Sequence, residues 1–141
     1  MKVSDIMTKN VIGISAEESA EVAARTLTHY NIGALPVCAA DGKVCGVVTD
    51  RDLVIRCMAA GKLPSQTKVK TVMTGQVLSV SPDAETAAAA QLMASRQIRR
   101  LPVVDQGKIC GIISLGDIAR QEENQNLAGA ALNGITSNVQ K

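Results

Sequence analysis

An internal repeat is the feature of this sequence that most restricts how the chain can fold. Met7-Thr8 returns as Met73-Thr74, 66 residues later. One residue is then lost, so that residues 42–49 (GKVCGVVT) return 65 residues later as residues 107–114 (GKICGIIS). A repeat of this length corresponds to one supersecondary unit, and its two copies are expected to fold alike. With 141 residues, the chain is long enough for two small repeats around a shared core and too short for two independent domains.

Both copies carry local signals for the order strand, helix, strand, strand, helix. In the first copy, Ser15 with Glu18 fits a capping box, and apolar residues follow at the spacing of one helix face. In the second copy, Ser81 is expected to cap a helix that has Pro82 at its first position. Both faces are dominated by small side chains, which predict close packing between the copies: Ala20, Ala23, Ala24 and Leu27 in the first, and Thr86, Ala89, Ala90 and Met93 in the second.

Two short apolar runs, residues 35–38 and 101–104, are expected to be strands. Each contains an internal proline, which cannot donate to a strand ladder and therefore predicts an edge position or a strand start. The turn residues Asp41-Gly42 and Gln106-Gly107 then predict hairpins. The second strands of these hairpins are expected over residues 44–48 and 109–113.

The domain organisation that we predict follows the repeat. The first copy is expected over residues 1–60, a connector over 61–68 and the second copy over 69–120. Residues 121–141 have no counterpart in the first half, and we expect a short helix or a disordered tail. The fold class predicted is α+β, with two pseudo-symmetric β-α-β-β-α repeats.

Composition and charge argue against several classes of partner. The chain has one Tyr and no Phe or Trp, so it lacks the stacking platforms of single-stranded nucleic-acid binders. Its 15 basic and 13 acidic residues are mixed along the sequence, without the basic stripe that phosphate-backbone binding requires. No apolar run approaches the roughly 20 residues of a membrane span, and the N-terminus lacks the apolar stretch of a signal peptide. We therefore predict a cytoplasmic protein that contacts neither nucleic acid nor membrane.

The cysteines and the histidine give little support for a metal site or for catalysis. Cys38, Cys45, Cys57 and Cys110 form no CxxC pair, and His29 is distant from all of them in sequence. Buried free thiols are the expected outcome, although a redox role for Cys38 or Cys57 stays open. His29 is expected to end a helix, and no nucleophile has an adjacent base. We predict that the chain is not an enzyme and binds no metal.

One motif occurs twice and combines a hydroxyl with a carboxylate. Residues 46–52 (GVVTDRD) and 111–117 (GIISLGD) both read Gly, two β-branched residues, a hydroxyl residue, any two residues, and Asp. A strand that runs into a helix start presents unpaired N–H groups, which suit phosphate. The same Thr-x-x-Asp and Ser-x-x-Asp spacing also fits a capping box, which would do no more than start a helix. Both interpretations stay open at this point.

Together with Ile-x-x-Leu-Pro-Val at residues 32–37 and 98–103, the doubled motif resembles the CBS-domain signature. Its tandem occurrence looks like a small stand-alone bacterial Bateman module, over about residues 1–120. The resemblance implies two CBS repeats packed through their sheets into one module, with two nucleotide sites in the cleft between them. It further implies a homodimer with a regulatory role toward an unknown protein target. The ligand would be AMP, ADP, ATP or S-adenosylmethionine, and no cofactor would be required.

The resemblance also assigns roles to particular residues. Asp52 and Asp117 would accept hydrogen bonds from the ribose hydroxyls, and Thr49 and Ser114 would contact ribose or phosphate. The adenine would be framed by the backbone around six residues: Ile32, Gly33, Ala34, Pro36, Ile98 and Pro102. Candidates for the phosphate are Arg51, Arg99 and Arg100, which are otherwise solvated surface residues. Two alternatives stay open: an interaction scaffold without a ligand, and a thiol redox or stress sensor.

Overall fold

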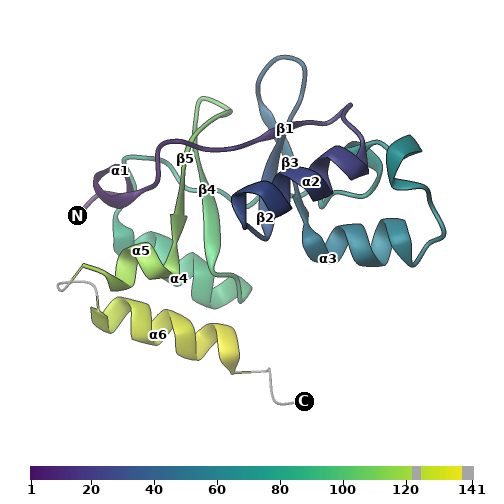
Figure 1. Ribbon diagram of the computed structural model, residues 1–141. Helices are drawn as coiled ribbons and strands as arrows, with labels where there is room; N and C mark the ends of the chain where they lie inside the picture. Colours follow the sequence, from purple (N-terminus) through teal and green to yellow (C-terminus); the bar gives the residue numbers. More distant parts are fainter. Residues whose placement is uncertain (122–124, 138–141) are drawn as a thin grey trace. The chain divides into compact units, whose positions relative to one another are not determined.

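The computed structural model describes residues 1–121 and 125–137, which form two compact units (Figure 1). The first unit is Ile12–Val77 and contains the first motif. The second unit combines Met1–Val11 with Leu78–Lys141 and contains the second motif. In the described part of the chain, no helix has the length and apolar character that crossing a bilayer requires.

The first unit contains a three-stranded sheet in the order β1-β2-β3. Strands β2 (Ala34–Cys38) and β3 (Val44–Thr49) form the predicted hairpin, and β1 (Ile14–Ser15) runs parallel to β2. Because β2 is the central strand, the edge or strand-start position predicted for Pro36 is wrong. The proline is tolerated because β1 is registered only opposite Val37 and Cys38, beyond Pro36.

Two longer helical segments and two short turns complete the first unit. Helix α2 (Ala20–Tyr30) follows β1, and the short α3 (Asp50–Asp52) continues as the π-helical segment η1 (Leu53–Met58). The 3-10 turns η2 (Pro64–Gln66) and η3 (Val69–Thr71) close the unit. The core is aliphatic and includes the fully buried residues Leu35, Val37, Val48, Val69 and Val72.

The second unit repeats this pattern around a two-stranded sheet. Strands β4 (Arg100–Asp105) and β5 (Lys108–Ser114) form an antiparallel hairpin, and Pro102 lies in a strand that is an edge of this sheet. Gln106 and Gly107 both have positive φ angles, of 53° and 82°, as a type I′ hairpin turn requires. The helices are α1 (Val3–Ile6), α4 (Thr86–Arg96), α5 (Leu115–Ala119) and α6 (Gln125–Thr136).

The two compact units do not coincide with the two sequence repeats. The first residues of each repeat form backbone hydrogen bonds with the other repeat and so belong to its unit. In the second unit, Thr8 exchanges two backbone hydrogen bonds with Ile112, of 2.9 and 3.0 Å. In the first unit, Thr74 makes the equivalent pair with Val47, of 2.9 and 3.0 Å. Residues 1–11 therefore pack with the second copy, and residues 69–77 pack with the first. The expected boundaries at 1–60, 61–68 and 69–120 describe the repeat in sequence, whereas hydrogen bonding divides the chain differently.

Both helix starts predicted from sequence were wrong, whereas the buried faces were nearly right. Helix α2 begins at Ala20, because the Ser19 hydroxyl accepts the Val22 N–H at 3.1 Å, while Ser15 lies in β1. Helix α4 begins at Thr86, and the Ser81 hydroxyl accepts the N–H of Asp83 instead. Of the predicted face residues, Ala24 is exposed and the others are buried: Ala20, Ala23, Leu27, Thr86, Ala89, Ala90 and Met93.

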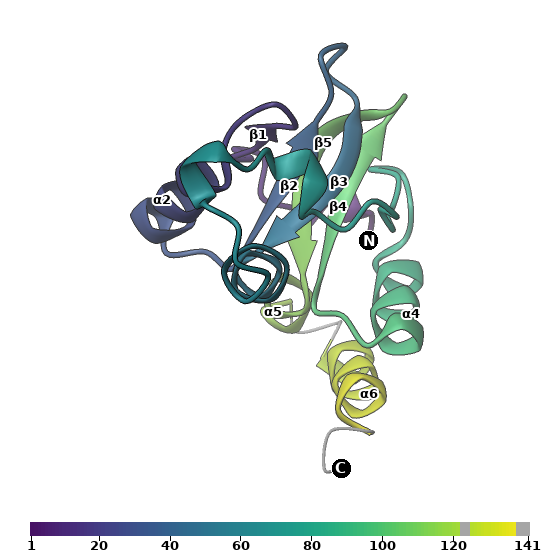
Figure 2. The same cartoon turned by 90° about the vertical axis from the view of Figure 1, so that its right-hand side faces the viewer.

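The tail contains the short helix that the sequence predicted. Helix α6 packs against α4 and α5, and it lies beside α4 in both views (Figures 1 and 2). It buries Ala128, Ala131 and Ile135, and Gly134 lies so close to α4 that an added Cβ would be 2.8 Å from the Ala94 Cβ. Small residues thus allow the two helices to approach closely. A disordered end of the tail, the other expectation, concerns residues 138–141, which lie outside the described residues.

Candidate functional site

The first motif places a hydroxyl and a carboxylate at the junction of β3 and α3. The Asp52 N–H donates to the Thr49 Oγ1 at 3.0 Å, and the Thr49 N–H donates to the Asp52 Oδ2 at 3.1 Å. Thr74 also donates to Oδ2, at 3.5 Å. Asp52 is 8% exposed, so its side chain does not point into bulk water. The capping-box interpretation is confirmed here.

The second motif forms the same capping box at the junction of β5 and α5. The Asp117 N–H donates to the Ser114 Oγ at 3.0 Å, and the Ser114 N–H donates to the Asp117 Oδ2 at 2.9 Å. Asp117 is 7% exposed. Its second oxygen, Oδ1, is paired with the guanidinium of Arg120. Each unit therefore holds one carboxylate in a fixed orientation through reciprocal bonds with its own helix start.

Most backbone N–H groups at these helix starts have partners, so the prediction of unpaired N–H groups is wrong for the first unit. There the Asp50 N–H donates to the Gly33 carbonyl at 3.1 Å, and the Arg51 N–H donates to the Asp50 Oδ1 at 2.8 Å. In the second unit, the Leu115 N–H donates to the Arg99 carbonyl at 2.8 Å. The carbonyls that precede β2 and β4 occupy the positions that a phosphate would need.

These same contacts bring part of the predicted residue set together within each unit. In the first unit Ala34 is paired with Thr49 in the sheet, and in the second unit Arg100 is paired with Ser114. Gly33 and Arg99 are attached to the motifs through their carbonyls. Ile32 and Ile98, half-buried, directly precede these residues, whereas Pro36 and Pro102 are paired with the second residue of each motif, Val47 and Ile112. The predicted cleft concerns both units together and stays a prediction.

The arginines near the motifs differ between the units. Arg51 in the first unit and Arg99 and Arg100 in the second are exposed, and none forms an ion pair with a described residue. Sequence reasoning missed two others, Arg56 and Arg120, which face the motif carboxylates. Their positions four and three residues after Asp52 and Asp117 are the spacing at which helical side chains meet, and this signal was available in the sequence.

In the described part of the chain, the thiols and the histidine form no hydrogen bond or ion pair with Asp52 or Asp117. All four cysteines are free, and burial raises the pKa of the Cys38 and Cys110 thiols. Cys57 is buried, and its thiol donates to the Lys62 carbonyl, whereas Cys38, Cys45 and Cys110 are only half-buried, so the expectation of buried thiols is wrong for these three. His29 is exposed in the last turn of α2 and meets the Tyr30 ring edge-on. Across residues 1–121 and 125–137, no three His, Cys, Asp or Glu side chains gather closely enough to hold a metal ion.

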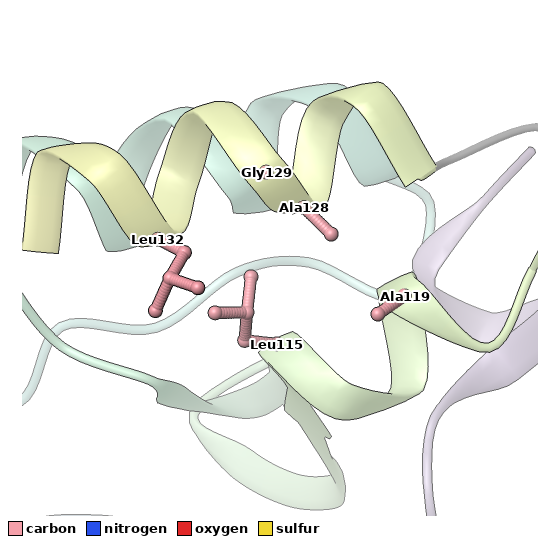
Figure 3. Close-up of a pocket in the computed structure, with 5 residues that line it drawn as sticks. All are labelled: Leu115, Ala119, Ala128, Gly129 and Leu132. Carbon is pink, nitrogen blue, oxygen red and sulfur yellow. The ribbon is translucent and has the colours of Figure 1, made fainter.

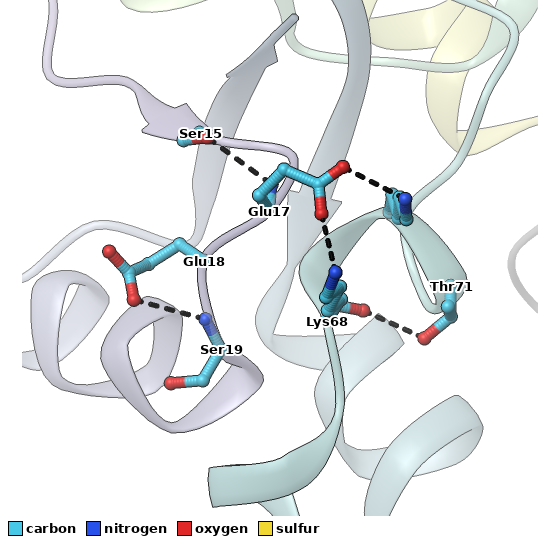
Figure 4. Close-up of polar contacts among 7 residues, drawn as sticks. Ser15, Glu17, Glu18, Ser19, Lys68 and Thr71 are labelled. Atoms are coloured by element: carbon cyan, nitrogen blue, oxygen red, sulfur yellow. Dashed lines mark hydrogen bonds and ion pairs between the residues drawn. The ribbon is translucent and has the colours of Figure 1, made fainter. Parts of the chain in front are cut away.

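Two other features lie outside the motif pairs. In the first unit, Glu17 accepts from Lys68 and Lys70, each at 2.8 Å, and these hydrogen bonds lower the pKa of Glu17 to about 2 (Figure 4). In the second unit, α5 and α6 border a hollow of about 340 Å³ (Figure 3). The residues that line it carry no polar side chain and so offer no charged partner for phosphate: Leu115, Ala119, Ala128, Gly129 and Leu132.

The repeated strand-and-cap arrangement agrees with a comparison against family models. The CBS-domain model matches this chain twice, over residues 3–58 and 69–124. The chain belongs to the CBS-domain family. It is a CBS pair, with two small sheets and mixed helix and strand content, as the sequence predicted.

Individual CBS proteins resemble this chain over most of its length. The CBS domain-containing protein YhcV of Bacillus subtilis is 40% identical over 95% of this chain and 94% of its own. The crystal structure of Hypoxic Response Protein I, with two coordinated zinc ions, has a TM-score of 0.79 and 32% identity, over 86% of this chain and 98% of that one. The CBS domain pair of MJ0100, solved with 5′-methylthioadenosine and S-adenosyl-L-methionine, has a TM-score of 0.74 and 30% identity, over 85% of this chain and 94% of that one.

Proposed function

We propose that this CBS pair binds an adenosine ligand, AMP, ADP, ATP or S-adenosylmethionine, at its two motif carboxylates, and thereby regulates a protein target. The observation that carries the proposal is the repeated geometry of Asp52 and Asp117. Both are buried acceptors fixed by a hydroxyl residue three positions earlier. The MJ0100 pair, at 30% identity, was solved with two adenosine compounds, which supports this ligand class.

The chemistry of the first carboxylate suits a ribose. The Asp52 Oδ2 accepts the hydrogen bonds described above, whereas Oδ1 accepts none from residues 1–121 and 125–137. Every fully buried polar side-chain atom of the described residues has a partner, so the Asp52 Oδ1 is not completely enclosed, although the side chain is only 10% exposed. A ribose presents two neighbouring hydroxyl donors, and hydrogen bonds to a charged acceptor contribute about 1.5–3 kcal/mol each.

Charges near each motif would contact the remainder of the ligand. Arg51 would serve the first site, and Arg99 with Arg100 the second, because exposed guanidinium groups without an ion partner can bind phosphate bidentately. The sites therefore differ in the elements that supply the cations. We propose that ligand binding favours one arrangement of the chain, or of a homodimer, since only a difference in affinity between arrangements produces a signal. The chain itself would catalyse no reaction.

Calorimetry and thermal-shift measurements test this proposal. The pure full-length chain would be titrated with AMP, ADP, ATP, NADH and S-adenosylmethionine. At least one adenosine compound is expected to release or absorb heat and to raise the melting temperature, because a ligand that binds only the folded state stabilises it. No heat and no thermal shift with any of them would end the proposal.

A second candidate function has support from the capping boxes. Because Thr49 and Ser114 are already engaged with their own helix starts, the motifs could serve folding alone in a ligand-free interaction scaffold. In that case Asp52→Ala and Asp117→Ala would lower stability, and nucleotides would not change binding of the protein partner. The thiol-sensor alternative, which would use Cys38 or Cys57, receives less support, because burial raises the pKa of Cys38 and so disfavours its reactive thiolate, and Cys57 is 1% exposed.

A further inference from the structure

The two motif carboxylates are not equally available, although their capping boxes are the same. In the first unit, Arg56 is the ion partner, and its Nε lies 3.7 Å from the Asp52 Oδ1, too far for a hydrogen bond. The Arg56 guanidinium instead donates to the Met73 carbonyl at 3.1 Å. Among the described residues, the Asp52 Oδ1 therefore has no hydrogen-bond donor.

In the second unit, the guanidinium of Arg120 donates directly to the Asp117 Oδ1. Since Oδ2 already accepts the Ser114 N–H, both oxygens of Asp117 have a donor. The carboxylate side chain is 8% exposed, whereas the arginine side chain is 71% exposed and can move without unpacking the core. A ribose hydroxyl that donates to the Asp117 Oδ1 must share this oxygen with Arg120 or displace the guanidinium. While the pair is intact, the positive guanidinium makes Oδ1 a weaker acceptor.

We propose that Arg120 competes with the ligand for the carboxylate of Asp117. A ligand therefore binds first at the Asp52 site. The Asp117 site prefers a ligand with phosphates, because these give the displaced Arg120 a new partner. This inference rests on the proposed function, since it orders and selects ligands at the same two sites. A phosphate compensates the displaced cation, and the neighbouring Arg99 and Arg100 have no ion partner among the described residues to lose. Adenosine without phosphate offers no such compensation.

The proposal predicts different behaviour for ATP and adenosine in calorimetry on the full-length chain. Wild-type protein should bind ATP at both sites, and adenosine tightly at the Asp52 site and only weakly at the Asp117 site. Arg120→Gln should tighten adenosine binding at the second site by about three- to tenfold, as expected when a partly exposed charged contact stops competing. Asp52→Asn should remove the tighter binding event, and Asp117→Asn the weaker one.

Arg25→Gln is the matched control. It also removes a largely exposed arginine, 75% against 71%, from a helical ion pair, here with Glu21. This variant should bind adenosine as the wild type does. Backbone NMR gives a readout without substitution of any residue. At substoichiometric ATP, the amides of Arg51 and Asp52 should shift before those of Gly116 and Asp117.

Three results would overturn the proposal and leave adenosine-ligand binding in place. These are two equal sites for adenosine on the wild type, unchanged adenosine binding in Arg120→Gln, or loss of the tighter event in Asp117→Asn. If no compound binds any form of the protein, with AMP, ADP, NADH and S-adenosylmethionine tested beside ATP and adenosine, the proposed function fails and the order of the two sites fails with it.

Discussion

The packing of α6 on α4 makes a sharp prediction, because two glycines of one helix should respond to alanine in opposite directions. At Gly134 a new Cβ would lie 2.8 Å from the Ala94 Cβ, about 1 Å inside ordinary carbon contact. Overpacking of this kind costs about 1–3 kcal/mol, against a gain in helix propensity of at most about 1 kcal/mol. Gly134→Ala should therefore lower the free energy of unfolding by about 1–2 kcal/mol.

Gly129 is the matched control in the same helix. A Cβ there meets nothing within 4 Å, so Gly129→Ala keeps the propensity gain and should stabilise the protein by about 0.5–1 kcal/mol. Urea denaturation followed by circular dichroism measures both changes, and a thermal scan should show melting temperatures on opposite sides of the wild type. If Gly134→Ala is as stable as Gly129→Ala, α6 does not pack on α4 as described.

Two further predictions concern titratable groups. Hydrogen bonds from Lys68 and Lys70 lower the pKa of Glu17 to about 2 in the folded protein, against 4.5 in the unfolded chain. Ionised Glu17 therefore stabilises the fold fully above about pH 4.5, and this stabilisation is lost as the pH falls toward 2. The melting temperature of Glu17→Gln should therefore lie below that of the wild type at neutral pH and low salt, and equal it near pH 2; a constant difference across that range would refute the assignment. Partial burial, which raises the pKa of Cys38 and Cys110, predicts that iodoacetamide at pH 7.5 alkylates them more slowly than an unfolded-chain thiol, measured by mass spectrometry. Equal rates would show that these thiols are accessible.

The repeat made much of the local structure predictable. Both hairpins, the strands around Leu35 and Leu101 and the capping boxes at Thr49 and Ser114 follow from short-range turn and capping chemistry, and all are present. The buried faces of the two helices followed from periodicity alone. These features need no knowledge of how distant segments meet.

What the sequence did not reveal depends on distant contacts. Ser15 was predicted to cap a helix because Glu18 follows it at the spacing of a capping box. Ser15 instead pairs with Cys38 in β1, and Ser19 caps the helix. The first residues of each repeat pack with the other repeat, through the backbone hydrogen bonds of Thr8 and Thr74. The strand partners of these two residues lie far away in sequence. Local patterns cannot choose between such partners.

The central claim is that the carboxylates of Asp52 and Asp117 bind the ribose of an adenosine ligand. The most direct test is the dissociation constant, by calorimetry, of the adenosine compound that binds most tightly, for wild type and for the Asp52→Asn, Asp117→Asn double variant. Loss of charge-assisted hydrogen bonds predicts binding at least about tenfold weaker, in a variant whose circular dichroism spectrum is unchanged. Equal dissociation constants for the two proteins would contradict the account.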